Sequence, residues 1–173
     1  GSGAQTLISL DSENKYVVYA YAIDNAGNRS DYVCTNGVVL DRTAPTIRDI
    51  TTPSKAELTL TDTSAKISFT GSEAGTCVYM VKKSSETAPA SITDFATEQT
   101  NDGFSTWTAK QDVSYAAMTA DGSNTVILTG LNANTEYTLY LAAVDQAGNS
   151  IQTIASRTFT TCKTMPTVAA ADM

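Results

Sequence analysis

Apolar and polar residues alternate most regularly within residues 131–149, and this pattern predicts a long β-strand between two turns. Four residues at every second position would share one face of that strand: Tyr137, Leu139, Leu141 and Ala143. Because alternate side chains of a strand point to opposite faces, we expect these four to be directed into a core. The sequence DQAGN at 145–149 then predicts a turn, because Gly148 tolerates a positive φ and Asp145 and Asn149 can bond to nearby backbone.

The same pattern occurs a second time, earlier in the chain. Tyr137 is matched by Tyr16 and Asp145 by Asp24, so both pairs are 121 residues apart, and DNAGN at 24–28 matches DQAGN. A constant offset without gaps indicates an internal repeat, with a unit on the order of 120 residues.

The repeat predicts how the chain is divided. Residues 1–43 are expected to be the C-terminal strands of a truncated unit, because strands equivalent to the first part of the repeat are missing from them. Residues 44–163 are expected to form a complete unit, joined to the first by a short linker that ends at Pro45. Residues 164–173 are expected to be a linker or tail.

Several of these residues carry a resemblance to a known family. Leu131, Thr135 and Tyr137 before an alternating strand resemble the fibronectin type III pattern, in which Tyr137 would be the tyrosine of the tyrosine corner. The Asp-x-Ala-Gly-Asn turn, and SEAGT at 72–76, are similar to turns in bacterial surface-protein repeats of the fibronectin III and Ig-like kind. The resemblance implies structural roles for Tyr16, Tyr137 and the two turns.

The resemblance covers residues 44–161 and the end of the preceding unit, and it departs from the family in two places. Phe69 stands where fibronectin III domains usually have tryptophan, and residues 84–104 look like an insertion after the third strand. The implied fold class is all-β, an antiparallel β-sandwich of fibronectin III or Ig-like type, preceded by the C-terminal strands of a second, truncated unit.

Further short runs between turn signals predict the other strands. In the complete unit we expect them at residues 46–51, 56–60, 65–70, 77–83, 107–110, 114–118, 125–128 and 151–161. In the first unit we expect them at 4–10, 16–23 and 29–40. Val18, Ala20 and Ala22 would then lack a facing sheet, so self-association or domain swapping through residues 1–43 is a real possibility.

The insertion is the first candidate for a binding surface. Ser91 and Asp94 have the spacing of a capping box, which predicts a helical turn. Phe95, Phe104 and Trp107 are candidate ligand-binding residues, because exposed aromatic rings can stack on sugars or anchor a protein partner. The alternative, which we favour, is that Phe95 and Trp107 only cover the sheet edge and the core.

Charge excludes some classes of partner. The chain has a net charge of −7, with 11 basic residues and no histidine. An acidic chain without a basic cluster is a poor binder of nucleic acids and of anionic membranes. No apolar run approaches the roughly 20 residues needed to span a bilayer, so membrane insertion is not expected.

Metal, cofactor and catalytic chemistry have little support. Asp24 with Asn28, and Asp145 with Asn149, could be calcium ligands, but six to eight oxygens are needed and Asx-type turn bonds explain both pairs better. Three cysteines occur: Cys34, Cys77 and Cys162. They form no CxxC motif, and the family topology implies that Cys77 and Cys162 lie at opposite poles, so neither a metal site nor a disulfide within the unit is expected.

No histidine base, serine elbow or phosphate-binding loop is present. Four carboxylates that could in principle form a catalytic pair lie on different loops: Glu73, Glu86, Asp94 and Glu98. We expect a non-catalytic protein without a cofactor.

The resemblance implies an extracellular or cell-surface repeat module of a bacterial protein, with a spacer and an adhesion or ligand-binding role toward a protein or a glycan. Two alternatives stay open. One is an accessory module, possibly carbohydrate-binding, of a secreted polysaccharide-degrading enzyme, and the other is a module for protein–protein assembly.

Overall fold

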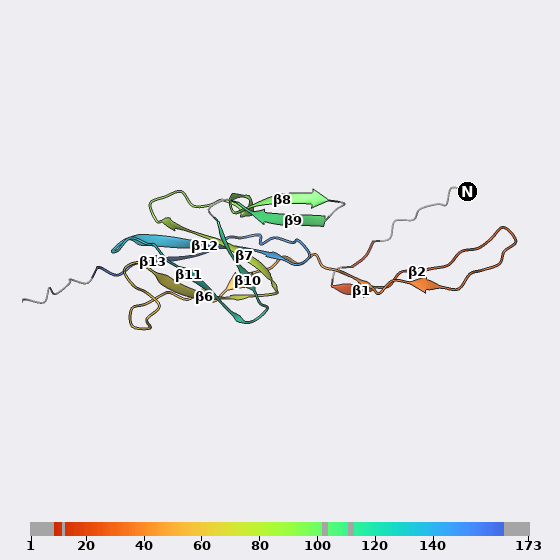
Figure 1. The fold of residues 1–173 in the computed structure, drawn as a ribbon, viewed down its shortest axis with the longest axis horizontal. Helices are drawn as coiled ribbons and strands as arrows, with labels where there is room; N and C mark the ends of the chain where they lie inside the picture. Colours follow the sequence, from red (N-terminus) through yellow and green to blue (C-terminus); the bar gives the residue numbers. More distant parts are fainter. Residues whose placement is uncertain (1–8, 12, 102–103, 111–112, 165–173) are drawn as a thin grey trace, which may run out of the picture. The chain divides into compact units, whose positions relative to one another are not determined.

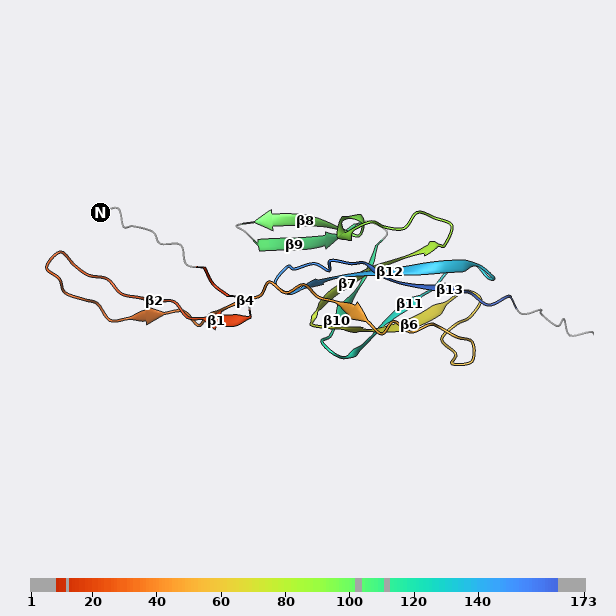
Figure 2. The same cartoon turned by 180° about the vertical axis from the view of Figure 1, so that it is seen from behind.

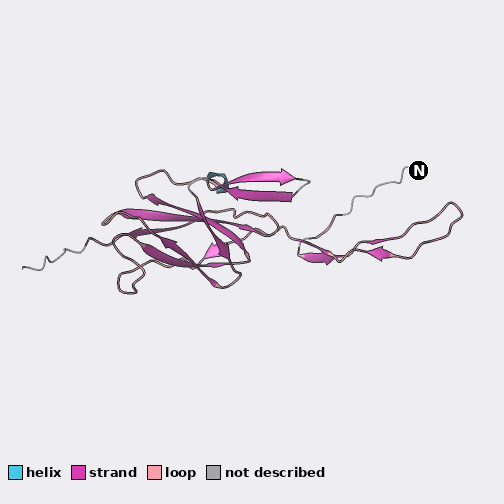
Figure 3. Ribbon diagram, viewed as in Figure 1, coloured by secondary structure: helices cyan, strands magenta, loops and turns pink. Residues whose placement is uncertain are grey.

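The computed structural model describes residues 9–11, 13–101, 104–110 and 113–164 (Figure 1). The chain divides into two compact units, residues 1–43 and 44–173, and the division lies at the linker placed before Pro45. Apart from one short 3-10 helix, η1 (Ile92–Asp94), the regular structure of the described residues consists of strands (Figure 3). The expected all-β class is therefore confirmed.

The first unit is a long antiparallel ribbon of two chain segments, each of which contains two short strands. The strands are β1 (Asn14–Tyr16) and β2 (Tyr19–Ala20) in the first segment, and β3 (Val33–Cys34) and β4 (Val38–Leu40) in the second. β1 pairs with β4, and β2 pairs with β3. The strands predicted at 16–23 and 29–40 thus occur as shorter, interrupted pieces. Of the strand predicted at 4–10, residues 4–8 lie outside the described residues and 9–10 are not in a strand.

The second unit contains nine strands in its described part. They are β5 (Ile47–Arg48), β6 (Ala65–Gly71), β7 (Gly75–Lys83), β8 (Ala96–Asn101), β9 (Phe104–Ala109), β10 (Ser114–Met118), β11 (Ser123–Leu128), β12 (Glu136–Asp145) and β13 (Ala155–Thr160). β10, β7, β12 and β13 form one sheet in that order, β11, β6 and β5 form a second, and β8 with β9 forms a hairpin. All the pairings between these strands are antiparallel.

The four-stranded and three-stranded sheets share one core (Figures 1 and 2). The four residues predicted to face inward from β12 are all buried: Tyr137, Leu139, Leu141 and Ala143. Ile67 and Phe69 of β6 are also buried in that core, while Tyr79 and Val81 of β7 are partly buried against it. The alternating pattern therefore identified the core face of these strands correctly.

The opposite face of β12 is covered as well. Ala142 is completely buried, and Thr138 is 8 % exposed. Ala142 belongs to a second apolar cluster with Val78 of β7 and Phe95 of the insertion. β12 thus has an apolar layer on both sides, so the insertion is part of the packed structure of this unit.

Two segments are less regular than the sequence predicts. Residues 56–60 were expected to be a strand, but residues 55–58 form a turn in which Leu58 has a φ of 56°. In the predicted strand 46–51, only Ile47–Arg48 is a strand, because Asp49 has a φ of 53°. A left-handed backbone at a residue other than glycine does not fit a β-ladder, so each strand is cut short.

The insertion folds as the helical turn η1 followed by the hairpin β8–β9. The helical turn was predicted, with Ser91 at its N-cap. Of this hairpin, only the end of its second strand was predicted, as part of the strand expected at 107–110. The hairpin pairs Ala96 with Ala109 at one end and Asn101 with Phe104 at the other. The turn predicted at 101–103 falls at the tip of the hairpin, where residues 102–103 lie outside the described residues.

Both repeats contain the same tyrosine hydrogen bond. The Asn132 N–H donates to the hydroxyl oxygen of Tyr137 at 3.0 Å, the kind of bond to upstream backbone that a tyrosine corner makes. In the first unit, the Asp11 N–H donates to the hydroxyl of Tyr16 at 2.7 Å. Each tyrosine thus bonds the backbone five residues upstream, and the offset of 121 residues is preserved in this contact.

We expect Tyr137→Phe to lower the free energy of unfolding by about 0.5–1.5 kcal/mol, the contribution of one hydrogen bond. Chemical denaturation of the full chain measures this change. Tyr115→Phe is the matched control, because Tyr115 is 70 % exposed and its loss should change stability by no more than about 0.5 kcal/mol. An unchanged midpoint for Tyr137→Phe would contradict the structural role of this hydroxyl.

Candidate functional site

The Asp-x-Ala-Gly-Asn turns, which the sequence analysis interpreted as structural, are each held by their own aspartate. The Asn149 backbone N–H donates to Oδ1 of Asp145 at 2.8 Å, and the Asn149 side-chain amide donates to Oδ2 at 2.7 Å. In the first unit, Asn28 makes the same two bonds to Asp24, at 2.9 and 2.8 Å. The two turns are therefore equivalent in their hydrogen bonds as well as in sequence.

These bonds have an electrostatic consequence at Asp24. The hydrogen bond from the Asn28 side chain, together with bonds from nearby backbone N–H groups, holds the pKa of Asp24 below its ordinary value. Donors that stabilise the charged form of a carboxyl group lower its pKa. The aspartate is thus a charged acceptor for the N–H groups of its own turn, which supports the structural interpretation over a calcium ligand.

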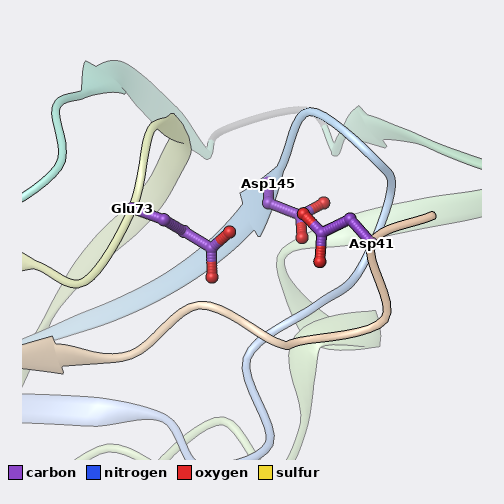
Figure 4. A group of neighbouring side chains, drawn as sticks. All are labelled: Asp41, Glu73 and Asp145. Atoms are coloured by element: carbon purple, nitrogen blue, oxygen red, sulfur yellow. The ribbon is translucent and has the colours of Figure 1, made fainter. Parts of the chain in front are cut away.

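Glu73 lies beside Asp145, a neighbour that the sequence analysis did not anticipate. The register of β7 and β12 pairs Gly75 with Asp145, so the turn before β7 brings Glu73 to the end of β12. Carboxylate oxygens of Glu73 and Asp145 lie within 4.8 Å of each other (Figure 4). Asp41, which Figure 4 also labels, belongs to the first unit.

This carboxylate pair is too small to be a cation site by itself. Calcium takes six to eight oxygen ligands, and two carboxylates supply at most four. Both oxygens of Asp145 also accept bonds from Asn149. Within the second unit, the pair is a contact between a buried aspartate of a turn, Asp145, and a partly exposed glutamate, Glu73.

Gly75 is what allows β7 and β12 to approach at this point. A Cβ atom at residue 75 would lie 2.2 Å from the carbonyl oxygen of Val144 and 2.9 Å from Cα of Asp145. No side chain fits in that space, so glycine is required for the register that brings Glu73 and Asp145 together.

The candidate ligand-binding aromatics are not assembled into a surface by the described residues. Phe95 is completely buried, so it is not part of a ligand surface, and the favoured alternative that it covers the core is confirmed for this residue. It packs in the apolar cluster with Val78 and Ala142, because the helical turn directs it onto the outer face of the four-stranded sheet. Phe104 and Trp107 are in β9, and their side chains lie outside the described part of the structure.

No protein-family model and no curated protein sequence matches this chain. In the residues that the structure describes, no helix is both long and apolar enough to cross a membrane. The candidate sites must therefore be judged by their chemistry alone.

Reactive side chains in the second unit are engaged in the structure. Burial raises the pKa of Cys77 to about 12, so its thiol is protonated at neutral pH and is a poor nucleophile. Glu86 accepts the Lys83 N–H at 2.6 Å. Asp94 accepts the N–H groups of Ala90 and Ser91 at 2.6 and 3.2 Å, which fixes the helical turn ahead of Phe95.

The surface of the second unit has two apolar hollows among its described residues. One, of about 320 Å³, lies between Pro45, Ile47 and Ile154. The other, of about 410 Å³, lies beside Leu58, Leu60 and Cys162, with Lys55 and Lys163 at its rim. The second hollow is notable because Leu58 is 89 % exposed and has a left-handed backbone. A strained, exposed apolar residue next to a hollow is a reasonable candidate for a contact with a partner.

We expect Gly75→Ala to destabilise the second unit by about 1–3 kcal/mol, because the added methyl group must push β7 away from β12. Thr76→Ala, which alters an exposed side chain at the next residue of β7, is the control and should cost less. Denaturation curves of the two variants measure the difference. Equal effects would show that residue 75 tolerates a side chain.

We expect the stabilisation that Asp94 provides to depend on pH. Hydrogen bonds from Ala90, then Ser91, lower the pKa of Asp94 below 3.8, so its charged form is favoured in the folded state. Its contribution should be fully present above about pH 5 and should disappear as the pH falls through the folded pKa, below 3.8. Denaturation of the wild type and of Asp94→Asn between neutral and strongly acidic pH measures this. A stability difference that does not change with pH would contradict it.

Proposed function

We propose that this chain consists of fibronectin III or Ig-like repeat modules with a non-catalytic spacer and adhesion role in a bacterial surface or secreted protein. The observation that carries the proposal is the repeated hairpin, in which the tyrosine bond and the aspartate-held turn recur 121 residues apart with the same partners. Tandem units of one kind are typical of extended arrays, in which each unit is a scaffold.

The sheet arrangement supports the family assignment. The three-stranded sheet β11-β6-β5 and the four-stranded sheet β10-β7-β12-β13 enclose one core, and Tyr137 bonds the backbone just before β12. A sandwich of seven short antiparallel strands with a tyrosine corner is the pattern expected for this family.

A spacer role agrees with how the polar loop residues are used. Asp24, Asp145, Glu86 and Asp94 each accept hydrogen bonds from their own turns, and the Cys77 thiol is buried. These groups stabilise loops, and none of them is held ready for proton transfer or nucleophilic attack.

For the adhesive contact, the hollow beside Leu58 is the best-supported place in the second unit. Its apolar wall would take an apolar side chain. Lys55, Lys163 and Asp62 also line the hollow, and their net charge of one positive unit would favour an acidic neighbour in the partner. This combination fits a protein partner better than a neutral glycan, which stacks on exposed aromatic rings.

The surface location is tested on intact cells of the organism that makes the protein. An antibody raised against the chain should label unpermeabilised cells or detect the protein in the medium. Labelling only after permeabilisation would overturn the proposed location.

The adhesive role is tested by applying the full chain to arrays of extracellular proteins and of glycans. We expect a protein ligand, and we expect Leu58→Ser to weaken its binding at least about tenfold, which corresponds to 1.4 kcal/mol. Ile127→Ser is the matched control, because Ile127 is also an exposed apolar residue, at 63 %, and does not line this hollow. Binding to glycans alone would favour the accessory carbohydrate-binding role.

A further inference from the structure

The three-stranded sheet of the second unit ends in an open edge at β11. The strand order of this sheet is β11-β6-β5, and among the described residues β11 pairs only with β6. That pairing runs along all six residues of β11, so the free edge on its other side is equally long. The opposite edge of the sheet, β5, has only two residues. The β11 edge is therefore the place where this sheet can be extended.

The sequence of β11 does nothing to block a further strand. Residues 123–128 read SNTVIL, without a charged residue, a proline or a glycine. Their register with β6 is continuous, so the strand contains no bulge. Open edges are usually blocked by charges, proline or a bulge, because their N–H and C=O groups can pair with another strand. Every second residue of β11 directs both groups away from β6 and toward the open side.

The neighbouring sheet leaves room beside this edge. A hollow of about 220 Å³ lies next to the end of β11, between Ile127 and Leu128 on one side and Tyr79 and Val81 of β7 on the other. Ile127 is 63 % exposed, although it lies in the middle of an apolar run. The backbone edge and an apolar side chain are thus both accessible at the same place.

The charges at the two ends of the β11 edge favour a second copy of the same chain. Asp121 lies just before β11 and, with Asp49, forms ion pairs with Arg48, so this end has one net negative charge. At the other end, Lys66 of β6 is exposed and stands directly opposite Ile127. When two β11 strands pair antiparallel, the Asp121 end of one copy lies near the Lys66 end of the other. Opposite charges then come together at both ends.

A two-fold axis also determines the register of such a pair. If the axis is perpendicular to the sheet, the outer faces of both copies lie on the same side, so exposed residues must stand opposite exposed residues. The exposed residues of β11 are Ser123, Thr125 and Ile127. The longest pairing that satisfies this condition places Thr125 opposite Thr125 of the second copy, and Ile127 opposite Ser123.

We propose that two copies of this chain associate by antiparallel pairing of their β11 edges, which joins the two three-stranded sheets into one sheet of six strands. The two-fold symmetry closes the assembly at a dimer. This inference rests on the second unit alone and does not depend on the adhesive contact proposed at Leu58.

Light scattering and sedimentation of the full chain at several concentrations test the association. The wild type should reach twice the mass of the single chain, and Thr125→Lys should raise the dissociation constant at least tenfold, because it places two like charges opposite each other at the axis. Thr160→Lys is the matched control, because Thr160 is also an exposed threonine but lies on β13, in the other sheet. Its dimer should persist.

Two outcomes of this experiment would overturn the proposal. A wild type that stays monomeric would leave the β11 edge to a strand from a different protein. A dimer that Thr125→Lys and Thr160→Lys leave equally stable would place the contact elsewhere, as association through residues 1–43 would do.

Cross-linking tests the register directly. With Cys34→Ser and Cys162→Ser as background, Thr125→Cys should form a disulfide between two copies on mild oxidation, because directly opposed residues have Cα atoms about 4.5–5.5 Å apart. Ser68→Cys is the control, since Ser68 stands opposite Thr125 on β6 and would be three strand spacings, about 14 Å, from its counterpart. Failure of Thr125→Cys to cross-link, or equal cross-linking by Ser68→Cys, would contradict the β11 pairing.

Discussion

The burial of β12 on both faces is the constraint on which the second unit depends. Leu139 and Leu141 fill the core between the sheets, and Ala142 is buried under the insertion. Each fully buried leucine contributes about 1.5–3 kcal/mol relative to an exposed one. A strand in this position cannot tolerate a change of register, because a shift by one residue would exchange its two apolar faces. The pairing of β7 with β12, and with it the approach of Glu73 to Asp145, follows from that fixed register.

A comparison of the two copies of the hairpin distinguishes features that depend on nearby residues from features that depend on distant strands. The tyrosine bond and the aspartate-held turn form in both units, because all their partners lie within five residues of one another. Burial differs completely between the copies, since it depends on strands far away in the sequence. The hairpin is thus locally specified, and its apolar face depends on a neighbouring sheet for cover.

The same distinction explains how much could be predicted from sequence. The core face of β12, the Tyr137 bond and the N-cap at Ser91 were predictable, because each follows from periodicity or from a short spacing. The turn around Leu58 was not, since no glycine or asparagine marks its left-handed residue.

Two features of the candidate site could not be derived from the sequence, and they share one cause. The orientation of Phe95 and the meeting of Glu73 with Asp145 depend on how distant strands are aligned. The requirement for Gly75 was the one available signal, because a glycine inside a strand often marks a close approach of another backbone.

Once these structural roles are assigned, the exposed apolar side chains are the features of the chain that have no structural role. The carboxylates at the turns accept bonds from their own backbone, and Phe95, which follows the helical turn, is in the core. In contrast, Leu58 and the residues of β1 and β2 expose apolar area without a covering layer among the described residues. Exposed apolar surface is costly in water unless a partner removes it, and for this reason the proposed adhesive contact is placed at Leu58.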